Sequence, residues 1–227
     1  MSDAGSTFRR VNENSERVDL ADMRVAYGGD ADVTEADLAD GWLALARSWL
    51  QQAIDAQLPE PNAIVLGTVD AEGRPATRTV LCKEMRDDGI VFYTNHTSEK
   101  GGHLAGRPVA SATFPWIGIQ RQVTVRGSVT RVSAEETAAY WATRPRGSQL
   151  GAWASEQSRP IASRADLERQ LAEVTRRFEG GDVPVPPHWG GYLIAAETVE
   201  FWQGRNNRLH NRLRVTPRDG AVVRLQP

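Results

Sequence analysis

The sequence predicts an α+β protein, mainly antiparallel β, in which a small barrel is flanked by helices. From residue 63 onward, short strand-like segments alternate with close turn signals such as DAEG and RDDG, which is typical of an antiparallel meander closing into a small barrel. Apolar residues recur at helical spacing in only a few stretches before and between these segments. With 227 residues, the chain can bury a core without a disulfide or metal.

The N-terminal part is predicted to contain helices after a disordered start. Residues 1–17 are polar and are expected to be disordered, whereas 18–227 are expected to form a single domain. A short helical stretch is expected over 20–27. A longer helix is expected from Thr34 to Ala53, because one apolar stripe recurs there at spacings of four, three and four: Leu38, Trp42, Leu45 and Trp49.

Strands and short helices are expected in the rest of the chain. A helix near Glu99–Leu104 interrupts the meander, the capping box Ser133-Ala-Glu-Glu opens a helix to about Thr143, and Ser163 opens another towards Phe178. The expected strands cover 63–69, 75–85, 90–94, 109–116, 120–132, 190–197, 198–204, 208–215 and 221–226.

Composition and motif content exclude several classes of function. The net charge of −2 gives no basic field for nucleic acid or a membrane surface. The single cysteine, Cys82, excludes an internal disulfide and fits a reducing compartment. No apolar run approaches the roughly 18 residues of a membrane span, and the polar N-terminus is unlike a signal peptide, so a cytoplasmic location is expected. There is no dinucleotide-binding glycine motif and no zinc-type Cys/His spacing, so no metal is expected.

The segment Arg208-Leu-His210-Asn-Arg212 is the sharpest local feature. In a strand, alternate residues share a face, so both guanidiniums and the imidazole are expected to point one way while Leu209 and Leu213 point the other. Such a face is costly to bury without anions. The pattern therefore indicates either an anion site or a solvated edge strand.

Two lysines stand out because every other cationic residue is arginine. Lys83 ends the segment Arg78-Thr-Val-Leu-Cys-Lys83, and a spacing of five puts its two cations on opposite faces of a regular strand. They can serve one ligand only if a bulge or a wrapped ligand intervenes; otherwise each faces a different ligand. Lys100 follows Tyr93-Thr94 and Ser98, where a strand runs into a helix N-terminus that can bind phosphate.

Further polar residues could form a second phosphate grip. Tyr140 and Arg144 share a helix face, and Ser148 is expected in the loop after Pro145. Without further evidence, a packed tyrosine and a surface arginine are the more usual explanation of this pattern. Gln122, Gln157 and Ser158 suit hydrogen bonds to the edge of a heterocycle, but nothing in the sequence separates them from other polar surface.

Taken together, the segments resemble the pyridoxine/pyridoxamine 5′-phosphate oxidase family over roughly residues 20–227. The matching runs are RTVLCK, FYTN, ATFPW, QRQVTVRG, YWATRPRGSQLGAWASEQS, VPVPPHWGGY and FWQGRNNRLHNR. The resemblance implies a split β-barrel homodimer with FMN at each of two subunit interfaces, and a dimerisation and substrate region at about 185–227. It implies oxidation of pyridoxine or pyridoxamine 5′-phosphate by O2 to pyridoxal 5′-phosphate, with release of H2O2 and, from the amine, ammonia.

The resemblance also implies the roles of individual residues. Arg208 and His210 are the implied catalytic residues. The implied FMN-binding residues are Arg78, Thr79, Val80, Leu81, Lys83, Tyr93, Thr94, Lys100, Gln122, Gln157, Ser158, Trp202 and Arg212. The implied substrate-binding residues are Arg24, Tyr27, Lys83, Tyr140, Arg144, Ser148, Arg208 and His210.

The chain departs from the family pattern at three positions. Glu99 stands where the family often has Arg, which removes one phosphate contact, while Cys82 replaces an aliphatic residue and Asn211 a frequent Asp. Two alternatives stay open: a related split-barrel flavin oxidase of the phenazine type, and a non-catalytic flavin- or pyridoxal-phosphate-binding protein. The first need not keep the Tyr140, Arg144 and Ser148 grip.

Overall fold

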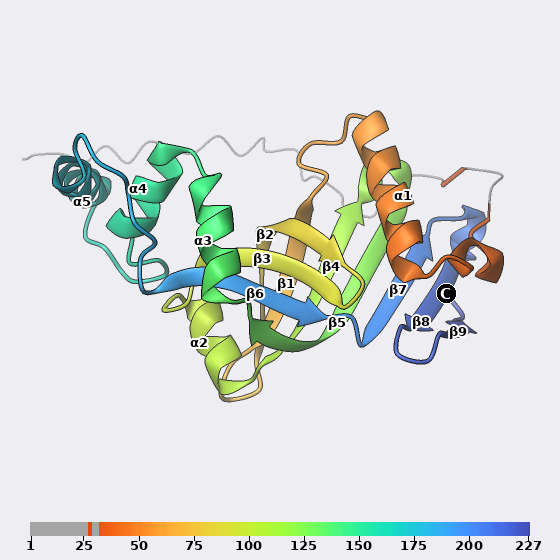
Figure 1. Ribbon diagram of the computed structural model, residues 1–227. Coiled ribbons are helices and arrows are strands. Elements are labelled where there is room, and N and C mark those ends of the chain that lie inside the picture. Colours follow the sequence, from red (N-terminus) through yellow and green to blue (C-terminus); the bar gives the residue numbers. More distant parts are fainter. Residues whose placement is uncertain (1–26, 29–31) are drawn as a thin grey trace, which may run out of the picture.

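A computed structural model describes residues 27–28 and 32–227 (Figure 1). The predictions of disorder over 1–17 and of a helical stretch over 20–27 lie outside the described residues, apart from Tyr27. Arg24 lies outside them too. The strands and most of the helices form where the sequence predicts.

Six antiparallel strands close into a barrel. They run in the order β4-β1-β2-β3-β6-β5, and β5 pairs back onto β4 to complete the circle. This confirms the predicted fold class. The barrel strands are β1 (Ala63–Val69), β2 (Pro75–Arg86), β3 (Gly89–Asn95), β4 (Val109–Trp116), β5 (Arg121–Arg131) and β6 (Trp189–Ala195).

Three further strands extend from the barrel on one side (Figure 1). They are β7 (Thr198–Gln203), β8 (Asn211–Thr216) and β9 (Ala221–Arg224). The long strand β5 joins the two parts, because its first half pairs with β7 and its last three residues, Val129–Arg131, pair with β6. The C-terminal strands therefore continue the barrel sheet.

The helices lie around this sheet. They are α1 (Trp42–Asp55), α2 (Glu99–Gly106), α3 (Ala134–Ala142), α4 (Arg146–Ala154) and α5 (Arg164–Arg177). The expected continuous helix from Thr34 is wrong, because a 3-10 turn (η2, Glu35–Leu38) is separated from α1 by Gly41 at φ +85. That backbone conformation ends a right-handed helix and suits glycine. Among the described residues, no helix is long and apolar enough to cross a membrane.

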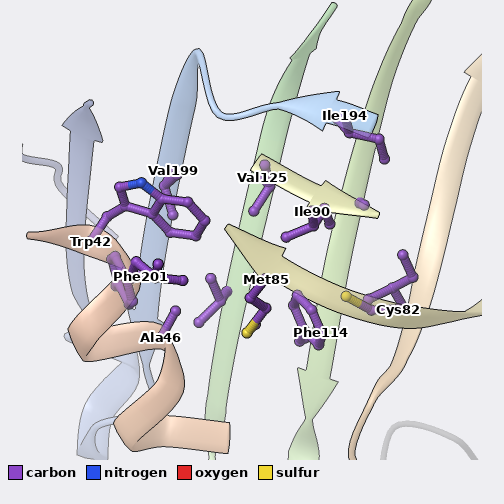
Figure 2. Packing of buried hydrophobic residues seen from close by; sticks show 14 of the residues in the cluster. Trp42, Ala46, Cys82, Met85, Ile90, Phe114, Val125, Ile194, Val199 and Phe201 are labelled. Atoms are coloured by element: carbon purple, nitrogen blue, oxygen red, sulfur yellow. The ribbon is translucent and has the colours of Figure 1, made fainter. Parts of the chain in front are cut away.

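The main core fills the barrel and the space under α1. Phe92, Phe114 and Phe201 are fully buried, since alternate residues of each strand point inward. Figure 2 shows Trp42 and Ala46 of α1 directed at the same cluster as Phe201 of β7. A second cluster of buried residues, distinct from this core, joins α3 and α4 to β6: Trp141, Leu150, Val183 and Trp189.

Candidate active site

A cavity of about 770 Å³ opens beside β2 and β3, where the ends of α2, α3 and α4 meet the barrel. It collects side chains that are far apart in the sequence. Its lining residues are Arg78, Thr79, Val80, Leu81, Lys83, Tyr93, Thr94, Glu99, Lys100, Tyr140, Thr143, Arg144, Pro145, Ser148, Gln157 and Ser158. Most of the cofactor- and substrate-binding residues expected from the sequence therefore share one cavity.

Strand β2 contains a bulge, and both Arg78 and Lys83 of this strand line the cavity. Cys82 pairs with Phe92 and Glu84 pairs with Val91, so Lys83 is an extra residue on β2 without a partner on β3. One extra residue reverses the alternation of side chains along a strand. The bulge that the spacing left open is therefore present, with its extra residue at Lys83, and the alternation changes from Glu84 onward.

Lys100 is a buried cation without an ion-pair partner in the described part of the chain. Lys100 is only 7% exposed. Its Nζ donates to three neutral oxygens: Gln157 Oε1 at 2.9 Å, Ser98 Oγ at 3.3 Å and Thr94 Oγ1 at 3.4 Å. Burial, and then the charge of Arg78, lower its pKa. A buried ammonium with only neutral partners is costly, and a bound anion would offset that cost.

Arg78 is a second cation beside Lys100 in the cavity, although the two residues are far apart in the sequence. Its Nη1 donates to Thr68 Oγ1 at 2.6 Å and to the Ala76 carbonyl at 2.9 Å, while Nη2 lies 3.8 Å from Glu99 Oε2. Burial lowers the pKa of Arg78, and Glu99 opposes that shift. Lys100 is buried and Arg78 is partly buried, and neutral hydrogen-bonding side chains lie beside them. Such a set of groups can bind a phosphate, so these residues fit the phosphate of the expected FMN.

The loop after α4 contributes to the same end of the cavity. The Gln157 amide oxygen also accepts from Thr94 Oγ1 at 3.1 Å, which ties this loop to β3. Ser158 has φ +72, a left-handed conformation that non-glycine residues seldom adopt. A strained residue at a ligand cavity is a common feature of binding sites.

Two further cations, Lys83 and Arg144, line the same cavity. Arg144 stacks 4.8 Å from the centroid of Trp189, and its Nη2 donates to the Ser148 carbonyl at 3.0 Å. Its Nε is buried without a partner in the described structure. Ser148 lies in the first turn of α4 rather than in the expected loop, because Pro145 ends one helix and caps the next.

Three aromatic rings support Arg144. Tyr93 of β3 stacks on Tyr140 of α3 with centroids 4.0 Å apart, and on Trp189 of β6 with centroids 5.5 Å apart. Trp189 was not predicted as a site residue, because a tryptophan at the start of an apolar strand looks like core. Its stacking contact with Arg144 shows only in the folded chain.

The remaining predicted residues that the structure describes form a separate cluster at the far end of the molecule, around β7 and β8 (Figure 1). Trp202 packs 4.7 Å from His210, and Tyr27 lies 5.7 Å from His210, by ring centroids. Gln122 and Arg212 flank Trp202 on the neighbouring strands. Neither these residues nor Arg208 line the cavity of their own chain.

The expected strand alternation at Arg208, His210 and Arg212 is wrong. Strand β8 begins only at Asn211, and Arg208 ends a 3-10 turn in which Asn207 and Arg208 have φ +56 and +65. Asparagine tolerates this conformation, and two such residues in a row break a strand. Leu209 is consequently 69% exposed and does not face the core.

The charges in this second cluster are partly compensated. Arg212 pairs with Glu200 at 2.7 Å, and Glu200 also pairs with Arg214 at 3.0 Å. His210 Nδ1 accepts from the Arg205 backbone N–H at 3.0 Å, and burial, followed by the charge of Arg208, lowers its pKa. No group of His, Cys, Asp and Glu in the described chain could hold a metal ion.

Solved structures share this architecture. PhzG from Burkholderia lata 383, crystallised with tetrahydrophenazine-1-carboxylic acid, matches with a TM-score of 0.79 and 31% identity over 88% of this chain and 100% of that one. A pyridoxamine 5′-phosphate oxidase-related, FMN-binding protein from Nostoc punctiforme PCC 73102 shares the fold at 18% identity, with a TM-score of 0.64 over 80% of this chain and 97% of that one. The fold and the cationic cavity define a split-barrel oxidoreductase.

Sequence comparisons give the family. Residues 50–178 match the family model "Pyridoxamine 5′-phosphate oxidase", and 189–227 match "Pyridoxine 5′-phosphate oxidase C-terminal dimerisation region". The chain is 66% identical over 215 residues to a pyridoxine/pyridoxamine 5′-phosphate oxidase of Mycolicibacterium gilvum (strain PYR-GCK), covering 92% of this chain and 97% of that one. A namesake from Nocardia farcinica (strain IFM 10152) is 59% identical over 222 residues, covering 92% and 99%. The chain belongs to the pyridoxamine 5′-phosphate oxidase family and is an enzyme of the oxidase class.

Proposed function

We propose that this enzyme uses FMN and O2 to oxidise pyridoxine 5′-phosphate or pyridoxamine 5′-phosphate to pyridoxal 5′-phosphate, with release of H2O2 and, from the amine, ammonia. One observation carries the proposal: a single cavity contains two cationic groups, Arg78 with Lys100 and Lys83 with Arg144. Arg78 and Lys83 are five residues apart on β2, about 16 Å along an extended strand. That spacing leaves room for two phosphate-bearing molecules whose rings meet between the groups.

The chain's own residues bind and orient in this proposal. Lys100, Arg78 and Thr94 would hold the FMN phosphate, with Gln157 and Ser158 nearby. Bound FMN would supply the two-electron chemistry and the reaction with O2. Lys83, Tyr140, Arg144 and Ser148 would grip the substrate phosphate, and this grip, remote from the reacting carbon, would fix the substrate's position.

The second cluster would complete the site from the partner subunit. Gln122, Trp202 and Arg212 would contact FMN, while Arg208 and His210 would lie over the substrate ring, because none of them reaches the cavity of its own chain. The match of 189–227 to a dimerisation region supports a homodimer. Arg208 would orient the substrate and stabilise charge, with His210 and Tyr27 supporting it. No obligatory base is assigned to either residue.

Two rival functions make different predictions. A phenazine-type oxidase, suggested by the 31% identity to PhzG, would act on an unphosphorylated substrate, whereas a binding protein would release no peroxide. Anaerobic mixing with pyridoxamine 5′-phosphate should bleach the flavin, and air should then yield peroxide. Flavin that stays oxidised with either phosphorylated vitamer would overturn the proposal.

Subunit complementation tests the shared site directly. Arg144→Ala removes a cavity residue and Arg208→Ala removes a residue of the second cluster, so each homodimer should have low activity when the substrate concentration is well below the wild-type KM. In a mixed dimer one of the two sites combines two wild-type halves, so random mixing should restore about a quarter of the sites. Activity that stays at the level of the separate variants would show that both residues serve the same subunit's site.

A further inference from the structure

Glu99 places a carboxylate among the cations of the cavity. It lines the cavity, its Oε2 lies 3.8 Å from Arg78 Nη2, and it directly precedes the buried Lys100 in α2. Arg78 is held on its other side by Thr68 and the Ala76 carbonyl, so its Nη2 is the atom turned towards Glu99. The acidic residue therefore occupies the side of the guanidinium that would otherwise be free for an anion.

The charges give Glu99 opposite effects on the empty and the filled site. Arg78 and Lys100 repel each other, and Glu99 offsets part of that repulsion for both. A phosphate monoester carries about −1.5 to −2 charges near neutral pH, so Glu99 is like-charged with the ligand. The same carboxylate that compensates the cations of the apoprotein must repel a bound phosphate.

We propose that Glu99 is a built-in competitor for Arg78 that weakens the hold on FMN and lowers the selectivity for phosphorylated over unphosphorylated flavin. This inference rests on the proposed assignment of FMN phosphate to Arg78 and Lys100. Half-occupancy of this enzyme by FMN would accordingly require a higher concentration of free FMN than in a site whose only charged groups are cations.

A purely structural role is the alternative explanation. Glu99 is the first residue of α2, where an acidic side chain interacts favourably with the helix dipole. Its side chain is 63% exposed, so its ion pair with Arg78 contributes little to stability. A purely structural role predicts that substitution of Glu99 changes thermal stability, and that any change in flavin affinity is the same with and without the phosphate.

The two roles separate in a comparison of FMN with riboflavin, which lacks the phosphate. Dissociation constants would be measured on apoprotein at low ionic strength by quenching of flavin fluorescence, for wild type, Glu99→Gln and Glu99→Arg. Glu99→Gln should tighten FMN roughly five- to tenfold, as expected for removal of one screened like charge near 4 Å. Riboflavin affinity should stay within about twofold, because no phosphate is present to be repelled. Glu99→Arg should tighten FMN further.

Glu135→Gln is the matched control. Glu135 is also an acidic residue in the first turn of a helix, α3, and it lies outside the cavity. Its substitution should leave both affinities unchanged. Equal affinities of wild type and Glu99→Gln for FMN, or equal changes for FMN and riboflavin, would overturn the inference. Absence of FMN binding by the wild type would instead defeat the proposed function. Added salt should shrink the difference between wild type and Glu99→Gln.

Discussion

Tyr93 and Tyr140 stack nearly parallel, with ring centroids 4.0 Å apart and an angle of 20° between their planes. Tyr93 belongs to β3 of the barrel and Tyr140 to α3, so this contact joins the wall assigned to the flavin with the helix assigned to the substrate phosphate. Trp189 continues the stack on β6 and carries Arg144 on its face. Rigid aromatic packing thus positions Tyr140 and Arg144, which are assigned to the substrate phosphate.

Two substitutions of Tyr140 should separate its ring from its hydroxyl. Tyr140→Phe keeps the stack, so thermal stability should hold while KM for the phosphorylated substrate rises. Tyr140→Ala loses the stack as well, at a cost of about 1 kcal/mol beyond lost burial. Melting curves and steady-state kinetics measure the two effects. Equal melting temperatures for the two variants would argue against a structural role for the ring.

Arg144 should act mainly through substrate binding. Arg144→Ala removes a charged hydrogen-bond donor, and KM for pyridoxamine 5′-phosphate should rise roughly ten- to a hundredfold while kcat changes little. Arg144→Lys keeps the charge but loses the planar stack on Trp189, so it should recover only part of the loss. An unchanged KM in Arg144→Ala would remove this residue from the grip.

His96 should make the fold sensitive to acid. Burial, with smaller contributions from the charges of Arg131 and His188, lowers its pKa from 6.5 to about 4. Its Nε2 is buried without a partner in the described structure, and its ring packs edge-on against Tyr192 at 4.9 Å. The unfolded chain therefore binds a proton that the folded chain rejects between these two pH values. The resulting stability is complete above pH 6.5 and is lost as the pH falls to about 4.

Melting temperatures across that window test this expectation. His96→Asn removes the titrating group and should flatten the decline relative to wild type. His103→Asn serves as a control, because His103 contacts Thr68 on another part of the barrel and should leave the decline in place. A wild-type decline that persists unchanged in His96→Asn would assign the acid sensitivity to other groups.

Cys82 should be inert in the folded enzyme. It is 5% exposed, and burial raises the pKa of its thiol to about 11. Because the thiolate is the reacting form, modification by a thiol reagent at pH 8 should be at least roughly a hundredfold slower in the native protein than in denaturant. Stopped-flow absorbance with a chromogenic disulfide reports both rates. Comparable rates would mean that β2 opens readily around its bulge.

The sequence predicts the barrel well because strand signals and capping boxes are local. The capping box at Ser133 and the cap at Ser163 each begin a helix where expected. The convergence of Arg78, Lys83 and Arg144 on one cavity could not be derived from spacing, since it depends on the packing of the end of α3 against β3 and β6. Family resemblance supplied those residues, and the described cavity brings them together.

The wrong predictions share a cause. Helix α4 was missed, and Ser148 placed in a loop, because a proline that stops one helix can also start the next. The strand predicted over 208–215 begins three residues late, because Asn207 and Arg208 adopt left-handed conformations that side-chain periodicity does not reveal. In both places local backbone geometry overrides the pattern of side chains.

Lys83 is the one extra residue of β2 in its pairing with β3, so the length of this strand affects which charges line the cavity. Removing Lys83 would restore a regular ladder with β3 and leave the hydrophobic interior nearly as it is, because Cys82 and Met85 would keep their buried positions. It would also remove one of the two β2 cations from the cavity. This deletion should consequently give a well-folded protein that binds one of its two phosphate-bearing molecules poorly, whereas a one-residue deletion in β1 should disrupt the barrel itself.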